Sequence, residues 1–255
     1  MTRIGFVGGG RIARIMLEGW KRAGALPADV KVMDADAQLA ARLAADFANT
    51  ATAALDAVAR QDVVIIALHP PLMAEVLPRI ASALRPDAVV LSLAPKPRFA
   101  GLSRLLGGFS RLARQNPNAP SIIGRGFNPI AFAGGLDEPG RGMLLDLVAP
   151  LGSTPVVAEE TIEAYALISA MGPTYLWFQF DVLRQLAAEF GLSETAARQA
   201  VAAMVHGAAT TLLESDLEVD QVLDLVPVKP LGENEAAITA FYRDRLVPLY
   251  AKLIA

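Results

Sequence analysis

The stretch RIGFVGGGRIARIMLEGW, residues 3–20, places a short apolar run, three consecutive glycines and an amphipathic segment in direct succession. An apolar run this short predicts a buried strand, and apolar residues at helical spacing after it predict a helix. Gly8, Gly10 and Ala13 match the pattern G-x-G-x-x-G/A, in which the first glycine permits a tight turn and the second admits a pyrophosphate close to the backbone. The stretch therefore predicts a dinucleotide-binding turn. The alternative is a turn that is rich in glycine only for the packing of helix on sheet.

The alternation of apolar runs and amphipathic segments continues to about residue 158. Further apolar runs lie at residues 30–34, 62–68 and 88–94, with amphipathic segments such as 36–48 and 72–84 between them. Strands and helices that alternate at this spacing predict a doubly wound parallel sheet. We therefore expect a Rossmann-type domain over residues 1–158, with weaker apolar runs at 121–134 and 154–158 as further strands.

From residue 159 onward the pattern becomes helical. We expect one helix from Glu159 to Gly191, a second that follows Ser193 as its N-cap, and a third over residues 235–254. Their apolar surface exceeds what three helices can hide among themselves. The chain is therefore expected to be an α/β protein whose all-helical domain, residues 159–255, forms a homodimer with a second copy.

The segment from Ala164 to Phe180 carries no charged side chain, which raises the alternative of a membrane span. Gly172-Pro173 interrupts the segment, and it is shorter than the roughly 20 apolar residues that a span needs. A helix that is apolar on all sides in a soluble protein is buried. We therefore expect a buried helix here and no membrane partner.

Composition excludes several other classes of function. The chain has 255 residues, a formal net charge of −3 and no run of basic residues, so nucleic acid is not an expected partner. Cysteine is absent, which excludes disulfides and thiolate ligands, and His69 and His206 lie too far apart in the sequence to form a metal site by themselves. We expect no signal peptide, because the apolar residues after Met1 run straight into glycines without a cleavage site. We expect a cytoplasmic protein that acts on a small molecule.

The end of the second predicted strand indicates which dinucleotide binds. Asp34 stands where a carboxylate can accept hydrogen bonds from both ribose hydroxyls of NAD and would repel the 2′-phosphate of NADP, and Asp36 adds a second negative charge. We therefore expect NAD rather than NADP. The alternative is that both carboxylates only cap the following helix, which leaves the preference open.

The ends of the other strands complete the expected cofactor site, because ligands of open α/β sheets bind outside the carboxyl ends of the strands. Residues 67–71 close the third predicted strand, and residues 92–97 close the fourth. The residues that we expect to contact the cofactor, in the glycine turn and at these strand ends, are Gly8, Gly10, Arg11, Ile12, Asp34, Leu68, His69, Pro70 and Ala94.

Five motifs stand in order along the chain: IGFVGGGRIARIMLEG at residues 4–19, IIALHPPLMAEVL at 65–77, RQNPNAPSIIGRG at 114–126, ALISAMGPTYLWFQFDVL at 166–183 and VHGAATTLLES at 205–215. Over nearly the full length they resemble the pyrroline-5-carboxylate reductase family, whose segments include MPNTPALVGEG and ALSGSGPAYVFLFIEAL. The resemblance implies a Rossmann domain, a helical domain that intertwines in a dimer, and a place in proline biosynthesis. It implies hydride transfer from NADH or NADPH to a cyclic imine, 1-pyrroline-5-carboxylate or a related imino acid. It also carries over Asn118 as a cofactor contact and Ser169 as a site residue.

The family's substrate loop, SPGGTTI, is not matched, because residues 226–238 read VPVKPLGENEAAI. A protonated imine needs positioning more than it needs an acid, so the hydroxyl of Ser169 or Thr174 is a sufficient partner for its nitrogen. Lys229 is the third catalytic candidate, as a clamp for a substrate carboxylate or as the acid of a keto-acid reductase, with Glu233 as its ionic partner. The remaining alternatives are a charged surface loop at Lys229 and a dimeric nucleotide-binding protein without catalysis.

Overall fold

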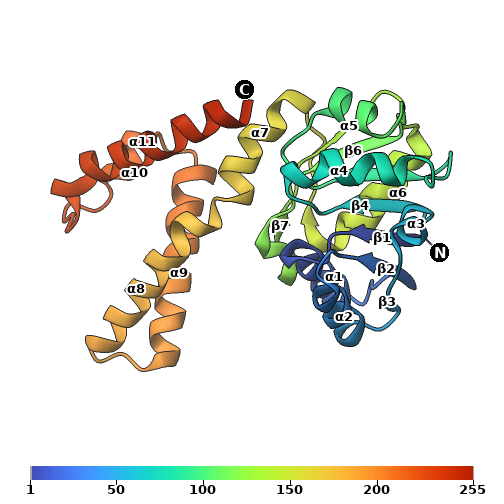
Figure 1. Cartoon of the computed structure of the whole chain (residues 1–255). Coiled ribbons are helices and arrows are strands. Elements are labelled where there is room, and N and C mark those ends of the chain that lie inside the picture. Colours follow the sequence, from blue (N-terminus) through green and yellow to red (C-terminus); the bar gives the residue numbers. More distant parts are fainter. Residues whose placement is uncertain (1, 255) are drawn as a thin grey trace. The chain divides into compact units, whose positions relative to one another are not determined.

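The computed structural model describes residues 2–254 and divides the chain into two compact units (Figure 1). The first unit holds the described residues up to Met171 together with those from Tyr250 onward. The second unit spans Gly172–Leu249 and consists of helices and their connections. The chain therefore leaves the first unit at residue 171 and returns to it at the end of the final helix.

The first unit is built on a seven-stranded sheet, counted over the described residues. Its strands are β1 (Arg3–Val7), β2 (Asp29–Met33), β3 (Thr50–Thr52), β4 (Val63–Ile66), β5 (Val89–Ser92), β6 (Leu112–Gln115) and β8 (Ile130–Phe132). They lie in the order β3-β2-β1-β4-β5-β6-β8, and all neighbours are parallel except β6 and β8, which are antiparallel. This order is that of a doubly wound Rossmann-type sheet, so the predicted fold class is confirmed.

Helices cover both faces of the sheet, because successive side chains of a strand point to opposite faces. Phe6 of β1 belongs to a hydrophobic cluster with α1 (Arg11–Arg22), α2 (Ala37–Asp46) and α6 (Glu138–Val148). Val7, the next residue, belongs to a second cluster with α3 (Leu55–Ala59), α4 (Pro70–Ala81) and α5 (Phe99–Leu105). Burial on both faces explains why the central strands are apolar without alternation.

Trp20 anchors α1 to the first of these clusters. Its side chain is fully buried, its ring centroid lies 6.2 Å from that of Phe6, and its Nε1 donates a 2.8 Å hydrogen bond to the carbonyl of Leu147. A buried indole that finds an acceptor for its N–H loses no hydrogen bond on folding. The helix that follows the glycine turn is therefore fixed firmly against the sheet.

The weaker apolar runs fold less regularly than expected. Residues 121–134 contribute β8 and the short β7 (Gly126–Phe127), but they begin in a 3₁₀ helix, η1 (Ala119–Ile123). The run at 154–158 contributes one isolated bridge, between Val156 and Ile130, and β7 pairs instead with β9 (Gly152–Ser153), which follows a second 3₁₀ helix, η2 (Ala149–Leu151). Strand β3 was not predicted, since it has three residues at the sheet edge and two of them are exposed.

The single helix expected from Glu159 to Gly191 is wrong. The chain forms a 3₁₀ turn, η3 (Glu159–Thr161), then α7 (Ile162–Tyr165), then a π-helical segment, η4 (Ala166–Ala170), and only then α8 (Pro173–Glu189). Pro173 has no N–H to donate and starts α8 at its first position. The N–H of Met171 donates to the carbonyl of Ala166, five residues back, as a π-helical turn requires.

The second unit contains α8, α9 (Glu194–Glu214), α10 (Val219–Asp224), η5 (Gly232–Asn234) and α11 (Glu235–Ile254), of which α11 continues into the first unit. A short turn joins α8 to α9, and the two helices pack against each other (Figure 1). Ser193 caps α9 as predicted, since its Oγ accepts a 3.2 Å hydrogen bond from the N–H of Ala196. The predicted helix at 235–254 is confirmed.

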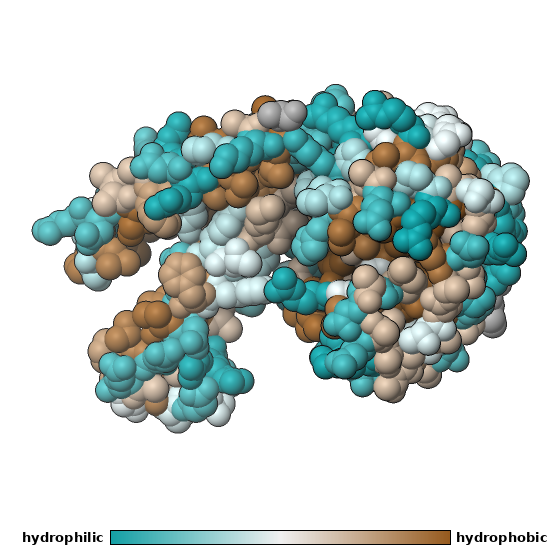
Figure 2. All heavy atoms as spheres, in the orientation of Figure 1, coloured by the Kyte–Doolittle hydropathy of each residue, from teal (hydrophilic) through white to brown (hydrophobic). Residues whose placement is uncertain are grey.

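The buried helix expected over residues 164–180 is wrong for the single chain. In α8 the side chains of Trp177 and Phe178 are 51% and 65% exposed, and in α11 that of Phe241 is 60% exposed. Figure 2 shows hydrophobic side chains at the surface of the helical unit, among hydrophilic ones. Large apolar side chains that gather in exposed positions on neighbouring helices are typical of an interaction surface.

No helix within residues 2–254 has the length and apolar character needed to cross a membrane.

Candidate functional site

The turn between β1 and α1 takes a shape that only glycine permits at its first position. Gly8 has a φ of +107°, and its N–H donates a 2.8 Å hydrogen bond to the carbonyl of Met33 in β2. A Cβ added at Gly8 would lie 2.5 Å from the carbonyl oxygen of Ala67, at the end of β4. Gly8 is therefore required by the fold, whether or not a ligand binds.

Gly10 lies in a different environment. It is the N-cap of α1, its φ of −74° suits any residue, and a Cβ added there would meet no atom of the described chain within 4 Å. The first turn of α1 holds no acidic residue and no side chain caps its N–H groups. A helix N-terminus left open in this way suits an anion, because its N–H groups and its dipole favour negative charge. The position above Gly10 is thus open and has the polarity that an anionic group favours.

A cleft of about 270 Å³ opens at this point, at the carboxyl ends of the strands. Its walls come from the glycine turn and from the ends of β4 and β5, and the residues that line it are Gly10, Arg11, Ile12, Ala67, Leu68, His69, Pro70, Leu93, Ala94 and Pro95. Seven of the residues expected to contact a cofactor are among them. The structure brings these seven together from three segments of the chain; Gly8, Asp34 and Asn118 lie outside the lining.

Asp34 holds the turn itself. Its Oδ2 accepts a 2.6 Å hydrogen bond from the N–H of Gly9, and its Oδ1 accepts a 2.9 Å hydrogen bond from the N–H of Asp36. Asp36 is the residue that caps α2, since its Oδ1 accepts from the N–H of Gln38. Helix capping therefore accounts for Asp36, whereas Asp34 presents a fixed negative charge where β2 ends beside the turn.

The two ends of the cleft can be told apart by the strand order. In folds of this class an acidic residue at the end of the second strand faces the adenosine ribose. Because β4 and β5 lie on the other side of β1 from β2, the walls formed by His69, Pro70, Ala94 and Pro95 lie across β1 from Asp34, on the side where a dinucleotide in a fold of this class would place its nicotinamide half.

Asn118 contacts the protein through both of its side-chain groups. Its Oδ1 accepts a 3.1 Å hydrogen bond from the N–H of Phe127, and its Nδ2 donates a 3.2 Å hydrogen bond to the carbonyl of Ser169 in η4. The Oγ of Ser169 donates to the carbonyl of Tyr165, 2.8 Å away. The side chain of Asn118 is thereby fixed against the segment that carries Ser169.

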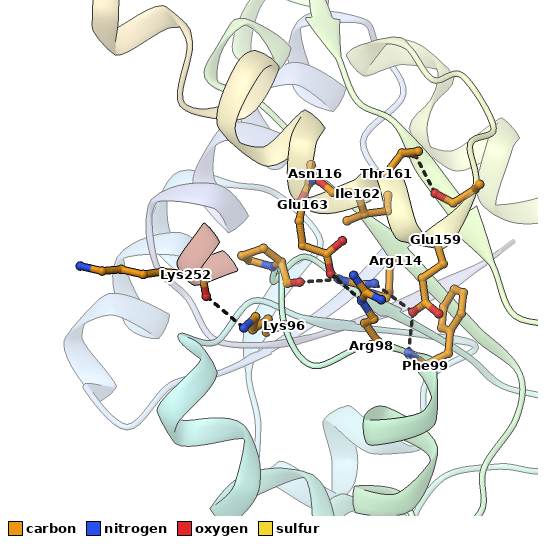
Figure 3. Close-up of polar contacts among 12 residues, drawn as sticks. Lys96, Arg98, Phe99, Arg114, Asn116, Glu159, Thr161, Ile162, Glu163 and Lys252 are labelled. Carbon is orange, nitrogen blue, oxygen red and sulfur yellow. Dashed lines mark hydrogen bonds and ion pairs between the residues drawn. The ribbon is translucent and has the colours of Figure 1, made fainter. Parts of the chain in front are cut away.

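An ion network with a buried centre lies at the ends of β5 and β6 (Figure 3). Arg114 of β6 and Glu163 of α7 are both fully buried, and Arg114 Nη2 lies 3.2 Å from Glu163 Oε1. Arg114 Nη1 lies 2.9 Å from Glu159 Oε1, and Arg98 Nε lies 3.1 Å from Glu163 Oε1. The hydrogen bond to Glu163 raises the pKa of Arg98. Arg114 Nη2 also donates to the carbonyl of Pro95, a residue of the cleft wall.

Sequence reasoning missed this network, although a signal was present. Arg114, Asn116 and Asn118 occupy alternate positions, and all three donate to one segment: Arg114 to the carboxylates of Glu159 and Glu163, Asn116 to the carbonyl of Ile162, and Asn118 to that of Ser169. Alternate residues of an extended chain share a face, and buried polar groups must find partners. The spacing Arg-x-Asn-x-Asn at the end of a buried strand indicates such a contact.

The second unit holds a separate pocket of about 620 Å³ between α8 and α11. Thr174, Tyr175 and Gln179 line it from α8, and Tyr242 lines it from α11, with its ring edge-on to that of Tyr175 at 6.3 Å. Burial and the neighbouring Tyr242 raise the pKa of Tyr175. Most of the lining is apolar, as expected for an interaction surface or an apolar ligand site.

Lys229 does not join this pocket. It is exposed between α10 and η5, and its carbonyl accepts a 3.0 Å hydrogen bond from the N–H of Gly232. Its carbonyl therefore helps to shape the turn that leads into η5. Among the side chains that the structure describes, no three metal-binding groups come together.

Two family models match separate parts of the chain. Residues 3–96 match the family described as NADP oxidoreductase, coenzyme F420-dependent, and residues 159–255 match the family described as pyrroline-5-carboxylate reductase dimerisation. The pyrroline-5-carboxylate reductase of Pseudomonas aeruginosa is 27% identical over 241 residues, covering 94% of this chain and 88% of the relative. That of Escherichia coli is 26% identical over 226 residues, covering 88% and 84%.

Solved structures agree with these relatives. The pyrroline carboxylate reductase of Plasmodium falciparum, with NADP bound, superposes with a TM-score of 0.74 at 18% identity, covering 99% of this chain and 94% of that one, and shows the likeness of fold. A pyrroline-5-carboxylate reductase from Coxiella burnetii superposes with a TM-score of 0.70 at 25% identity and the same coverage. Relatives that extend through both units agree with the family model over the helical part: the chain is similar to pyrroline-5-carboxylate reductases over nearly its whole length, and residues 159–255 match that family's dimerisation model.

Proposed function

We propose that this protein is a reductase that uses NADH or NADPH to reduce the C=N bond of a cyclic imino acid, 1-pyrroline-5-carboxylate or a close relative of it. The observation that supports this most is the cleft at the strand ends, where open space above Gly10 faces an uncapped helix N-terminus, in a chain similar to this family. A diphosphate has the shape and the charge that this position favours.

The roles of the residues follow from their places in the cleft. Gly10, Arg11 and Ile12 would bind the diphosphate through backbone N–H groups, and Arg11 would add a cation. The remaining predicted contacts in the cleft are Leu68, His69, Pro70 and Ala94, which would form the wall for the nicotinamide. Gly8 has no side chain to contact the diphosphate, and its role is to shape the turn.

When bound in this cleft, NADH or NADPH would supply the hydride that the imine carbon accepts. The chain has to hold the two rings face to face and exclude water, because positioning provides most of the rate when the imine nitrogen already carries a proton. Ser169 and Thr174 remain the proposed hydroxyl partners of that nitrogen, and Lys229 the proposed partner of the substrate carboxylate. Asn118 remains a proposed cofactor contact; its fixed hydrogen bond to the carbonyl of Ser169 makes it a support for that residue as well.

Turnover assays with both reduced cofactors test the proposal. We expect the purified protein to oxidise NADH or NADPH in the presence of 1-pyrroline-5-carboxylate or another cyclic imino acid, and to leave small keto acids unreduced. If NADH or NADPH is oxidised only in the presence of keto acids, imine reduction is rejected. The alternative, a keto-acid reductase in which Lys229 acts as the acid, then takes its place. Cofactor binding without turnover of any imine or keto acid would leave a nucleotide-binding protein.

We further propose that NAD is preferred over NADP, because the charge of Asp34 is fixed by two backbone N–H groups at the adenosine end of the cleft. The Asp34→Asn variant keeps the size of the side chain and removes the charge. We expect it to shift the ratio of NAD to NADP affinity towards NADP by at least about tenfold, which corresponds to about 1.4 kcal/mol. Calorimetric titration of both cofactors measures the ratio.

Asp36→Asn is the matched control for this shift. Asparagine caps a helix as well as aspartate does, so α2 is kept, and the charge of Asp34 stays in place. We expect a smaller change in the ratio than for Asp34→Asn. If the native protein, Asp34→Asn and Asp36→Asn have the same ratio of NAD to NADP affinity, Asp34 does not determine which cofactor is preferred.

We also propose a homodimer formed through the helical domain, with the functional boundary between residues 158 and 159, where the dimerisation family model begins its match. The exposed aromatic side chains of α8 and α11 support this proposal, since a second copy would bury them. The cytoplasmic location expected from the sequence stays a prediction.

A further inference from the structure

Arg114 contacts the backbone of the loop that forms one wall of the cleft. Pro95 and Ala94 line the cleft, and the carbonyl of Pro95 accepts a hydrogen bond from Arg114 Nη2. Further along the loop, the N–H of Phe99 donates 2.6 Å to Glu159 Oε1, the oxygen that also lies 2.9 Å from Arg114 Nη1. One cluster of charges, centred on the buried Arg114, thus holds both ends of the connection from the cleft to α5.

The same cluster fixes the segment that carries Ser169. Arg114 binds Glu163 in α7, and six residues later η4 presents Ser169, whose carbonyl is held by Asn118. Arg114 and Asn118 are themselves only four residues apart, and both side chains are buried. The Pro95 wall and the Ser169 segment are therefore held by a single stretch of chain at the end of β6.

We infer that Arg114 is a positioning residue for hydride transfer: it holds the Pro95 wall, at the nicotinamide end of the cleft, in register with the segment that carries Ser169. The inference rests on the proposed function for its consequence in turnover. Its structural part concerns how firmly the nicotinamide end of a bound cofactor is held. The order of the bound nicotinamide can be measured with no substrate present.

The chemistry of the side chain suits this task. A guanidinium carries five N–H donors in a rigid plane, so it can bind two carboxylates of one segment and a carbonyl of another at fixed angles. A buried ion pair contributes little net stability compared with an apolar pair of the same size. The contact with Pro95 therefore has its main consequence in the geometry of the cleft, since apolar residues would hold the fold equally well.

The test compares Arg114→Lys with Arg111→Lys. Lysine keeps the charge that neutralises Glu163 but lacks the planar fork, so it cannot bind the Pro95 carbonyl and both carboxylates together. Arg111 lies at the opposite end of the same two strands, where its Nε donates 3.2 Å to the carbonyl of Ala88 and its Nη2 donates 2.9 Å to Asp137. The control thus loses equivalent contacts at the end of the sheet away from the cleft.

In turnover we expect Arg114→Lys to lower kcat by about 30-fold or more, because small misplacements of reacting groups cost about that much in rate. The KM of the imine should stay within about threefold, since a merely positional fault leaves binding in place. The deuterium isotope effect on kcat, measured with NADH or NADPH deuterated at the transferred position, should rise as hydride transfer becomes rate-limiting. Arg111→Lys should match the native enzyme in all three.

Binary complexes provide the readout that needs no substrate. We expect Arg114→Lys to bind ADP-ribose as the native chain does, but to lose most of the enhancement of NADH fluorescence that an ordered nicotinamide gives. If native protein binds NADH and reduces no imine, the proposed function fails, and this comparison alone decides the role of Arg114. Should Arg114→Lys prevent folding, Glu163→Gln is the second variant, because it weakens the contact between Arg114 and Glu163. We expect it to change kcat and NADH fluorescence in the same direction.

The inference is overturned if Arg114→Lys and Arg111→Lys lower kcat equally, or if the variant lowers only thermal stability while NADH fluorescence and kcat stay native. Either result would assign the network to folding alone.

Discussion

The Gly10→Val variant is expected to bind nicotinamide dinucleotides at least about 100-fold more weakly than the native chain, a loss of about 2.8 kcal/mol, with its Tm unchanged. No described atom lies within 4 Å of a Cβ added at Gly10, and the backbone there suits an ordinary residue. Valine would therefore fill the space above the N-terminus of α1 without disturbing the fold. Isothermal titration with NADH and NADPH measures the affinity, and calorimetric unfolding measures Tm.

Gly8→Ala provides the contrast for this prediction. Its φ of +107° is strained for any residue with a side chain, and the added Cβ would meet the carbonyl oxygen of Ala67 at 2.5 Å. We expect the variant to lose several degrees of Tm, whereas Gly10→Val loses only affinity. Native affinity in a folded Gly10→Val protein would show that no diphosphate lies on this turn, and the redox assignment would fall with it.

Phe178→Asp is expected to convert a dimer into a monomer. Phe178 and Phe241 are 65% and 60% exposed in the single chain and line one apolar pocket between α8 and α11. A carboxylate buried in the middle of an apolar interface without a partner is strongly unfavourable, whereas in a monomer it stays in water. Sedimentation velocity at micromolar protein should give the mass of two chains for native protein and of one chain for the variant.

Leu72→Asp is the control for that experiment. Leu72 is 47% exposed on α4, in the unit that carries the sheet, so it adds the same charge to a surface that the proposed dimer does not use. We expect it to sediment as the native protein does. A native chain that is monomeric at micromolar concentration, or a Phe178→Asp variant that remains dimeric, would contradict the proposed interface.

The sheet and its glycine turn were predictable because each depends on a local pattern. Residues 3–20 combine a strand, a glycine turn and a helix in direct succession. The central strands are recognisable as unbroken apolar runs. Their ends meet at one edge of the sheet by geometry alone, so the contacts from Leu68 to Pro70 and at Ala94 could be placed in the cleft beforehand.

The elements that escaped prediction depend on partners distant in sequence. Glu159 and Glu163 look like the polar start of a helix, and only the fold brings them to Arg114, 45 and 49 residues earlier. The exposure of Trp177 and Phe178 was missed for a related reason. An uncharged helix is expected to be buried, but the sequence of one chain does not say whether its own residues or those of a second copy cover the helix. The break at Pro173 was readable, since proline ends the preceding helical turn.

The placement of the two tryptophans has a practical consequence. The sequence contains only Trp20 and Trp177, one fully buried against the sheet and the other half exposed on α8. An indole in an apolar interior emits at shorter wavelengths than one in water, so the intrinsic emission of native protein should be a sum of a blue and a red component. Melting of the nucleotide-binding half would erase the blue component, while association of the helices would shift the red one, and a single spectrum would follow the two events separately.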